Sequence, residues 1–533
     1  MKVFKTRWPF SKGGKTVPNF DNPPPSPREK PPEPPEALFA SLDKNLELLR
    51  EMFHSPLNKD FIVREFISAG TPCAVLSIEG FVDRKDIEDH IMRPLMHLSA
   101  FSQRPSRRDE DLLNYVLPLG NAGVMSDPVA ISKSLLIGNV AILLDGCPRA
   151  ILCEAQGMQR RSVGLPLVEG VVSGPNQAFN ESMRVNIALV RSVLKSPDFV
   201  TELVDVGKSI KSSAAICYMQ NIANPTLVEE VKRRIRGIDK DVIYNVGEIN
   251  QLIEDKPFAL IPQGMLTERP DRAAAFAMDG MILILYDNSP HALCVPVTIS
   301  HFVQTSEDSF LRWQYGSLIR ITRIFGTLIA LLLPAMYNAL ILFHQELLPL
   351  ELLTSLVEGH VLVPFPATVE LVLMIGIFDL LNEAGIRMPN SLGSTLGIIG
   401  ALVLGQAAVA ANLISPALII IVSITGLGSF SVPSYSLALA IRIRRYAYIV
   451  ISTLLGFVGI ALMTLCFLML DCGVESFGVP VLSPFTPKMP HNPDSVFRLP
   501  ISLQRMIPPM FRPKQRTAAR NPRGWEEENS PNE

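Results

Sequence analysis

The stretch that decides the fold class is MPNSLGSTLGIIGALVLGQAAVAANLISPALIIIVSITGLGSFSVPSYSLALAI, residues 388–441, which contains no Asp, Glu, Lys or Arg. A helix needs about 20 apolar residues to cross a bilayer, so this stretch predicts two membrane spans joined by a short link. Charged residues are only 19% of the 533-residue chain but are frequent in residues 1–320. This contrast predicts a water-soluble front part followed by a membrane part. The formal net charge of −2 does not indicate nucleic-acid binding.

Three more hydrophobic segments accompany this stretch. Residues 324–343 (IFGTLIALLLPAMYNALILF) and 446–470 (YAYIVISTLLGFVGIALMTLCFLML) have the length and composition of spans. Residues 361–381 are weaker because they contain Glu370 and Asp379. That segment is either a span lining a polar interior or a re-entrant or surface segment. The membrane domain, residues 316–486, is therefore expected to hold about five hydrophobic segments in an α-helical, multi-span arrangement.

Basic residues predict the orientation of the chain. The first 15 residues are basic and lack an apolar stretch, so they do not form a secretory signal, and the front part is expected to be cytosolic. Arg312, Arg320 and Arg323 before the first span agree with the excess of basic residues on the cytosolic side. The RIRR sequence at residues 442–445, before the last span, agrees as well.

The C-terminal tail, residues 487–533, complicates this topology. Between residues 498 and 523 it holds seven Lys or Arg and no acid, which also indicates a cytosolic location. Two cytosolic flanks cannot enclose a single crossing. Either residues 476–485 dip back into the membrane, or the last segment is a hairpin. The basic tail itself either meets anionic lipid headgroups or is a disordered, solvated tail.

The soluble part predicts an α/β fold. Residues 1–40 form a proline-rich basic arm, and residues 41–315 alternate between strand-like and helical patterns. Strands are expected at residues 73–78, 140–144, 150–153 and 281–286, and helices at residues 83–98, 178–194 and 228–236. Two segments, NVAILLDGCPRAILCEA (139–155) and GMILILYDNSPHALCVPV (280–297), each place a turn between β-rich runs. Two related hairpins predict two subdomains.

The sequence contains no complete catalytic or metal-binding motif. The Gly207-Lys208-Ser209 sequence resembles the end of a phosphate-binding loop, but Glu202 stands where that motif needs glycine. The eight His are scattered, and the seven Cys form no C-x-x-C pair of the kind that binds zinc. We therefore expect no enzyme activity, no catalytic residues, no metal and no cofactor.

Specific motifs resemble a known family. Residues 364–430, beginning PFPATVELVLMIGIFDLLNEAGIRMP, resemble the A subunits of GerA-type spore germinant receptors. TERPD (267–271), SED (306–308), SGPNQAFNESMRVNIALVRS (173–192) and SFGVP (476–480) are similar to other parts of that family, so the resemblance covers residues 60–490. Departures from the family pattern mark a divergent member: Asn382, Ala410, Ser173, Asn176 and Gln177.

The resemblance implies a function, a location and partners. The family's A subunits lie in the inner membrane of the dormant spore, where they work with a transporter-like B subunit and a C lipoprotein to sense nutrients and trigger ion release. They are expected to oligomerise into a ligand-gated ion channel. The alternatives are a helper paralogue of the stage V sporulation AF type, or a transporter-like permease subunit.

Charged residues near the doubtful segment suggest a pore or gate. Asp379, Glu383 and Arg387 are spaced to lie on one helix face, with Glu370 nearby in sequence. Charges at membrane depth are expensive and usually face a polar interior. This face either lines or gates an ion path, or belongs to an interfacial helix whose charges meet water.

Other residues suggest packing and assembly. Small residues permit close helix contact, and buried amides bond across helices. The candidates for helix packing are Gly393, Gly397, Gly400, Gly405, Gln406 and Asn412. In the soluble part, Glu268, Arg269 and Asp271 form either an ordered loop or a contact surface for a neighbouring subunit.

Overall fold

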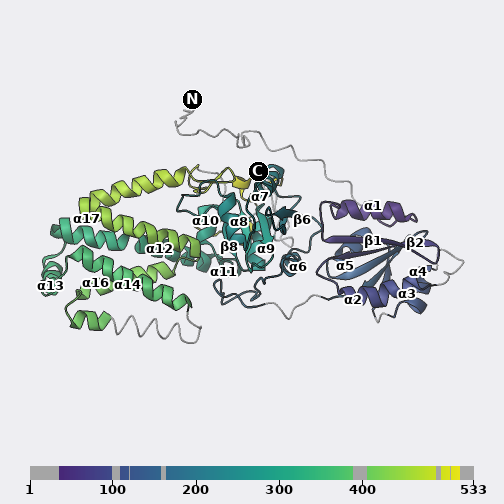
Figure 1. The fold of residues 1–533 in the computed structure, drawn as a ribbon, viewed down its shortest axis with the longest axis horizontal. Helices are drawn as coiled ribbons and strands as arrows, with labels where there is room; N and C mark the ends of the chain where they lie inside the picture. Colours follow the sequence, from purple (N-terminus) through teal and green to yellow (C-terminus); the bar gives the residue numbers. More distant parts are fainter. Residues whose placement is uncertain are drawn as a thin grey trace, which may run out of the picture.

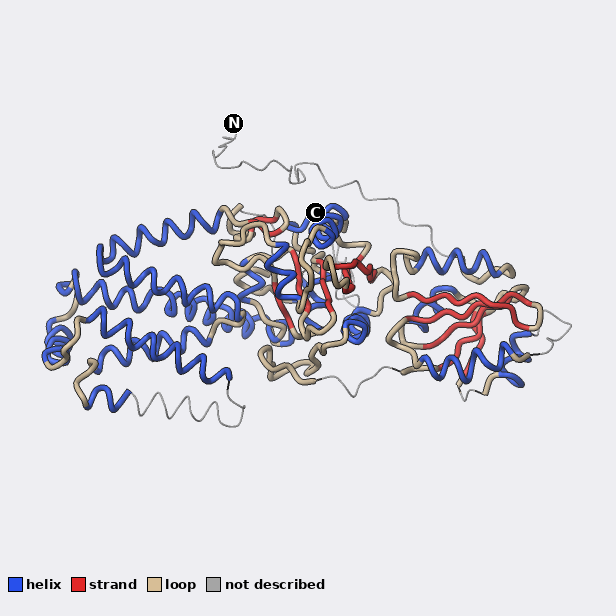
Figure 2. Tube along the Cα trace, viewed as in Figure 1, coloured by secondary structure: helices blue, strands red, loops and turns tan. Residues whose placement is uncertain are grey.

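The computed structural model describes residues 35–98, 108–118, 121–157, 164–387, 405–487, 494–504 and 506–515. Two β-sheets covered by helices lie in a row with a bundle of long helices at one end (Figure 1). Figure 2 shows the same order, with strands confined almost entirely to the two sheets. The predicted fold class, an α/β region followed by a helical part, is confirmed.

The first sheet has five antiparallel strands in the order β1-β2-β4-β5-β3. The strands are β1 (Phe61–Ser68), β2 (Thr71–Ile78), β3 (Ala122–Met125), β4 (Asn139–Leu144) and β5 (Ala150–Glu154). Buried apolar residues of α1 (Leu42–Met52) and α5 (Pro128–Leu135) pack in one core with the sheet. The segment containing α2 (Arg84–Asp86), η1 (Ile87–Met92) and α3 (Arg93–Met96), together with α4 (Arg108–Asp111) and η3 (Leu112–Val116), belongs to a second core.

The second sheet repeats this topology, in the order β6-β7-β9-β10-β8. The strands are β6 (Phe199–Val206), β7 (Ser212–Met219), β8 (Met265–Thr267), β9 (Ile282–Tyr286) and β10 (Ala292–Val295). Its helices are α6 (Met183–Leu194), α7 (Pro225–Arg236), α8 (Val246–Ile253) and α9 (Pro270–Met278). The two hairpins noticed in the sequence are β4–β5 and β9–β10, so the prediction of two related subdomains is confirmed.

The repeat extends to individual hydrogen bonds. The hairpin residue Asp145 accepts a bond from the backbone N–H of Leu42 at 3.1 Å, and Asp287 accepts one from Met183 at 2.9 Å. Each aspartate thereby engages the first residue of the helix that packs on its sheet. The next hairpin residue has positive φ in both copies: 86° at Gly146 and 60° at Asn288, the residue types that tolerate it best.

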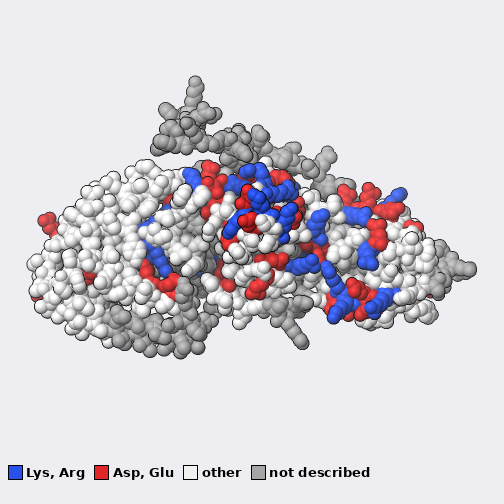
Figure 3. All heavy atoms as spheres, in the orientation of Figure 1, with Lys and Arg blue, Asp and Glu red and all other residues white. Residues whose placement is uncertain are grey.

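The helical part follows two short helices, α10 (Ile299–Val303) and α11 (Glu307–Phe310). Its helices are α12 (Trp313–Phe343), α13 (Leu350–Val361), α14 (Ala367–Arg387), α16 (Pro416–Phe430) and α17 (Tyr435–Cys472). Within the described residues, α12 and α17 are long and apolar enough to cross a membrane, whereas α16 is shorter. On the face drawn in Figure 3, the bundle surface is largely free of charge, and charged side chains gather over the α/β region.

The last hydrophobic segment is not the single span that residues 446–470 predicted. Helix α17 breaks at Gly456, whose φ of 58° and ψ of −139° are not helical. The two arms fold back on each other, since Arg444 pairs with Asp471 at 2.5 Å and the Tyr448 hydroxyl bonds Thr464 at 3.1 Å. Of the two alternatives for this segment, the structure has the hairpin.

The chain then returns to the α/β region. The hairpin of β11 (Glu475–Ser476) and β12 (Val479–Pro480) is held there by Ser476, whose hydroxyl donates to the carbonyl of Gln263 at 2.7 Å. Further along, Lys514 donates to the carbonyl of Gln220 at 2.6 Å. The described tail therefore lies on the same side of the bundle as the sheets. Lys514 is thus bound to the α/β region, and contact of the basic tail with anionic lipid stays a prediction.

Candidate functional site

A charged cluster lies among the bundle helices. The carboxylate of Asp379, on α14, lies 4.0 Å from Arg442 Nε and 3.9 Å from Arg445 Nη1, both on α17. The hydroxyl of Tyr446 donates to Asp379 at 2.7 Å. Two guanidinium groups therefore face one carboxylate, and the cluster carries a surplus of positive charge.

The arginine at the centre of the cluster is deeply buried. Arg445 is 1% exposed, and its Nη2 donates to the hydroxyl of Ser429 on α16 at 2.9 Å. Its Nε and Nη1 atoms are buried without a hydrogen-bond partner among the described residues. Burying a charge is costly unless the charge is paired. If packing were the only requirement at position 445, an apolar residue would be more favourable there than an arginine.

A second buried carboxylate lies near the start of α14. Glu370 is 1% exposed; its Oε2 lies 2.9 Å from His360 Nε2 on α13, and its Oε1 accepts a bond from the backbone N–H of Ser415. Nine residues separate Glu370 from Asp379, or about 13 Å along a helix. This spacing is about two and a half helical turns, so the two acids project from opposite faces of α14, and each contacts other parts of the bundle.

Uncharged polar side chains lie beside this second acid. Asn338 on α12 donates to Ser452 at 3.0 Å and to Thr453 at 2.9 Å on α17. Thr368, two residues before Glu370, donates to Asn338 at 2.8 Å. The polar groups of α12, α14 and α17 therefore meet inside the bundle, while the exposed faces of these helices carry residues such as Phe325, Val372 and Leu454.

The structure separates the four residues proposed for a pore or gate. Glu370 and Asp379 are held in the interior as described, whereas Glu383 is exposed. Arg387 is the last residue of α14, and its side chain lies outside the description. The sequence missed the partners His360, Arg445 and Tyr446, although RIRR was visible as a basic cluster. Their role in an ion path stays a prediction.

Three of the six candidates for helix packing lie among the described residues. Gly393, Gly397 and Gly400 lie outside the described residues. Gly405 is buried, and a Cβ there would meet Ile419 at 3.7 Å. Gln406 and Asn412 are exposed on the single chain. Helix packing by these residues stays a prediction.

The loop around Glu268, Arg269 and Asp271 is held within the chain. Arg269 is 1% exposed, pairs with Asp271 at 2.8 Å and donates to the carbonyl of Pro175 at 2.9 Å. Glu268 Oε1 accepts hydrogen bonds from the backbone N–H groups of Val168 and Glu169, both at 2.6 Å. These contacts match the ordered loop, and a contact with a neighbouring subunit stays a prediction.

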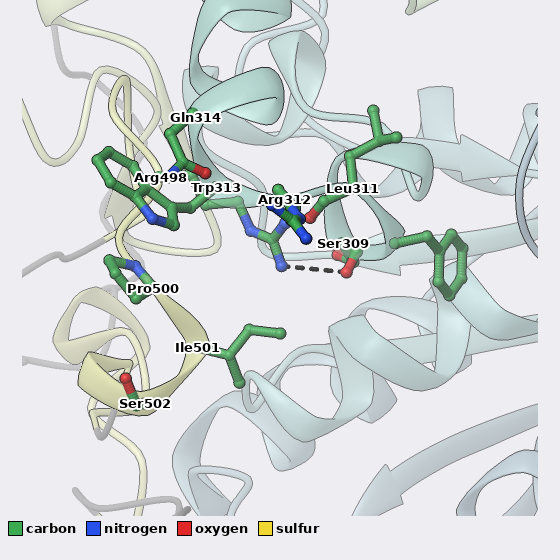
Figure 4. A pocket seen from close by; sticks show the side chains of 10 residues that line it. Ser309, Leu311, Arg312, Trp313, Gln314, Arg498, Pro500, Ile501 and Ser502 are labelled. Atoms are coloured by element: carbon green, nitrogen blue, oxygen red, sulfur yellow. Dashed lines mark hydrogen bonds between the residues drawn. The ribbon is translucent and has the colours of Figure 1, made fainter.

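The junction between the α/β region and the bundle is also charged. Asp308 is fully buried and accepts bonds from Arg320 at 2.9 Å and Arg323 at 2.8 Å, both on α12. Arg498 of the tail donates to backbone carbonyls beside Asp308, including that of Ser309 at 3.1 Å (Figure 4). This side chain is buried in the protein, so it lies neither at a lipid surface nor in a solvated tail. A cavity of about 500 Å³ lies at this junction. Trp313 is among the side chains that line it (Figure 4).

Comparisons with known proteins identify the family. The chain is 36% identical to spore germination protein KA of Bacillus subtilis (strain 168) over 473 residues, which are 88% of this chain and 86% of that protein. It is 33% identical to spore germination protein GerLA of Bacillus cereus over 483 residues, covering 90% of this chain and 97% of the relative.

A solved structure is also similar. The crystal structure of the N-terminal domain of the A subunit of the Bacillus megaterium spore germinant receptor GerK3 is 27% identical, with a TM-score of 0.37, and the match covers 49% of this chain and 96% of that one. The model of the Bacillus/Clostridium GerA spore germination proteins matches residues 47–510. Because that match takes in both sheets and the helical bundle, the chain belongs to the GerA family of spore germination proteins.

Proposed function

We propose that this chain is the A-type membrane subunit of a spore germinant receptor and couples nutrient sensing to ion release. It works as part of an oligomeric, ligand-gated ion channel in the spore inner membrane, with its α/β region in the cytosol. A transporter-like B subunit and a C lipoprotein are its partners. The names of the relatives, which are spore germination proteins, support the receptor role.

The charged cluster around Asp379 is the observation that carries the channel proposal. An aspartate and two arginines lie among helices whose outer faces are apolar. Such charges are expensive at membrane depth and mark ion pathways or charge-gated contacts in membrane proteins. Because Asp379 is on α14 and both arginines are on α17, relative movement of these helices changes the distances within the ion pairs.

Ion release from spores tests this proposal. Asp379→Asn keeps the shape of the side chain but removes the charge that holds Arg442 and Arg445. We expect the rate of ion release after nutrient addition to change at least about tenfold in spores that contain normal amounts of the protein. Glu351→Gln, at an exposed acid of α13, is the matched control. Unchanged release from the Asp379→Asn spores would contradict a role of the cluster in the ion path.

Deletion of the gene separates the receptor from a helper of the stage V sporulation AF type. A dedicated receptor subunit is required for the response to one or a few single nutrients in a panel. Normal responses to every nutrient after deletion would count against the sensor role.

A further inference from the structure

The cavity of about 500 Å³ at the junction lies at the start of α12, a helix long and apolar enough to cross a membrane. The end of α11, the first residues of α12 and the returning tail form its wall (Figure 4). The residues that line it are 309–314, 498 and 500–502. The charged residues among them are Arg312 and Arg498, so the charge that this wall presents is positive.

Arg498 is a buried cation whose hydrogen bonds go to uncharged groups. It is 3% exposed, and its guanidinium donates to backbone carbonyls of residues 311 and 309 at 2.8 and 3.1 Å. The acids that act on its charge, Asp308 and Asp494, each pair with Arg320 as well. Burial is the largest influence on the pKa of Arg498 and lowers it below the ordinary value. An anion in the cavity would therefore stabilise this charge.

Arg312 and Trp313 give the rim of the cavity the character of a membrane interface. Both side chains are exposed. Tryptophan is enriched at the level of lipid headgroups, and an arginine can bind a phosphate through two parallel hydrogen bonds. The rim therefore combines an aromatic ring suited to the interface with a cation suited to a phosphate group.

An apolar stripe on α12 leads from the cavity to the outer surface of the bundle. Gln314 lines the cavity, and the stripe follows it at helical spacing on the same face. The residues of the stripe are Leu318, Ile321 and Phe325, which are 62%, 41% and 64% exposed. A free phosphate ion would use the arginines alone, whereas a phospholipid would use the arginines and the stripe.

We propose that this cavity binds one anionic phospholipid. Its phosphate lies between Arg312 and Arg498, and an acyl chain packs on Trp313 and along the apolar stripe. The site takes a single lipid molecule into the protein, which differs from contact of the basic tail with the surface of a bilayer. The proposal depends on α12 lying in a membrane and does not depend on ion conduction by the bundle.

Quenching of Trp313 fluorescence tests the site in the purified full chain in micelles of a neutral detergent, with Trp8 and Trp525 replaced by Phe. The probes are phosphatidylglycerol and phosphatidylcholine with brominated acyl chains, which quench tryptophan at short range and differ in net charge. We expect saturable quenching by phosphatidylglycerol, with an affinity at least about tenfold above that of phosphatidylcholine. Glycerol phosphate, which carries the phosphate without acyl chains, should not displace the lipid at equal concentration.

Substitutions separate the charge from the apolar contact. Arg312→Gln should weaken phosphatidylglycerol binding at least about tenfold and remove the preference over phosphatidylcholine, whereas Arg312→Lys should keep that preference. Leu318→Asn should weaken the binding of both lipids alike, because it removes apolar contact and no charge. Arg236→Gln, at an exposed arginine of α7, is the matched control.

Three results would overturn the proposal: no saturable quenching by phosphatidylglycerol, equal affinity for the two lipids, or unchanged phosphatidylglycerol binding by the Arg312→Gln chain. Displacement of the lipid by an equal concentration of glycerol phosphate would overturn it too, because the acyl chain would then contribute nothing to binding.

Discussion

Neutralising Asp308 should loosen the junction between the α/β region and the bundle. This carboxylate is fully buried, and it accepts bonds from Arg320 Nε at 2.9 Å and from Arg323 Nη1 at 2.8 and 3.0 Å. Asp308→Asn preserves the size of the side chain but leaves both guanidinium groups without their shared counter-charge. Arg498 bonds the backbone carbonyl of residue 308, so the substitution does not remove that contact.

The cost follows from the burial of the partners. Removing one member of a buried ion pair costs about 3–5 kcal/mol, because the remaining charge is left uncompensated. Arg320 is 2% exposed and cannot recover much hydration. Arg320 keeps its bond to Asp494 at 2.5 Å, which places the expected loss at the lower end, about 3 kcal/mol.

Fluorescence of Trp313 reports this loss locally. Trp313 is the first residue of α12 and the only tryptophan in the described part of the chain. For the assay, Trp8 and Trp525 are replaced by Phe in every variant, so that Trp313 is the only fluorescent tryptophan. The urea midpoint of the purified chain in micelles should fall for Asp308→Asn and remain unchanged for the neighbouring Glu307→Gln. In a chain that already carries Arg320→Gln and Arg323→Gln, the same substitution should cost much less. A loss under about 1 kcal/mol, or an equal loss in both backgrounds, would refute the reasoning.

Two further substitutions test the hairpin at Gly456 and the carboxylate of Asp279 at the end of α9. Gly456→Ala should lower the thermal midpoint by an amount equivalent to about 1–2 kcal/mol, because φ is +58° there and a Cβ would lie 2.9 Å from His344; an unchanged midpoint would argue against the tight turn. Asp279→Asn should leave stability unchanged near pH 4 and raise it above pH 7. The folded chain retains the Asp279 proton between its ordinary pKa of 3.8 and about 7, so wild-type stability falls as pH rises through that range, by at most about 4 kcal/mol. Thermal unfolding at pH 4 and pH 8 measures the difference, and equal gains at both pH values would contradict the assignment.

Local patterns predicted the α/β region well. Alternating apolar runs placed β2, β4, β5 and β9, and the likeness of residues 139–155 to 280–297 led correctly to two related subdomains. Strands β6 and β7 were not predicted, although residues 199–219 are as β-rich as the runs that were. The equivalent roles of Asp145 and Asp287 depend on contacts more than 100 residues away, which periodicity cannot show.

Only one member of the charged cluster, Asp379, could be predicted from the sequence. Spacing identified Asp379 as a charge on a membrane helix, but its partners lie more than 60 residues away on α17. Basic residues near a span are usually assigned to its cytosolic flank, and RIRR fitted that rule. The hairpin depends on a single backbone conformation at Gly456, and a glycine in an apolar run does not reveal whether the helix reverses there.

The fold connects the soluble junction to the charged cluster through α17. Ile441 packs in one apolar core with Ala330 of α12 and with Phe302 and Phe511 of the soluble side. Arg442 follows Ile441 directly and faces Asp379. A displacement of the α/β region that moves this core therefore moves the arginines relative to α14. Asp379 meets the arginines at 3.9–4.0 Å, so such a displacement also changes the distances within these ion pairs. The same core thus contacts both the soluble region and the helix that carries Arg442 and Arg445.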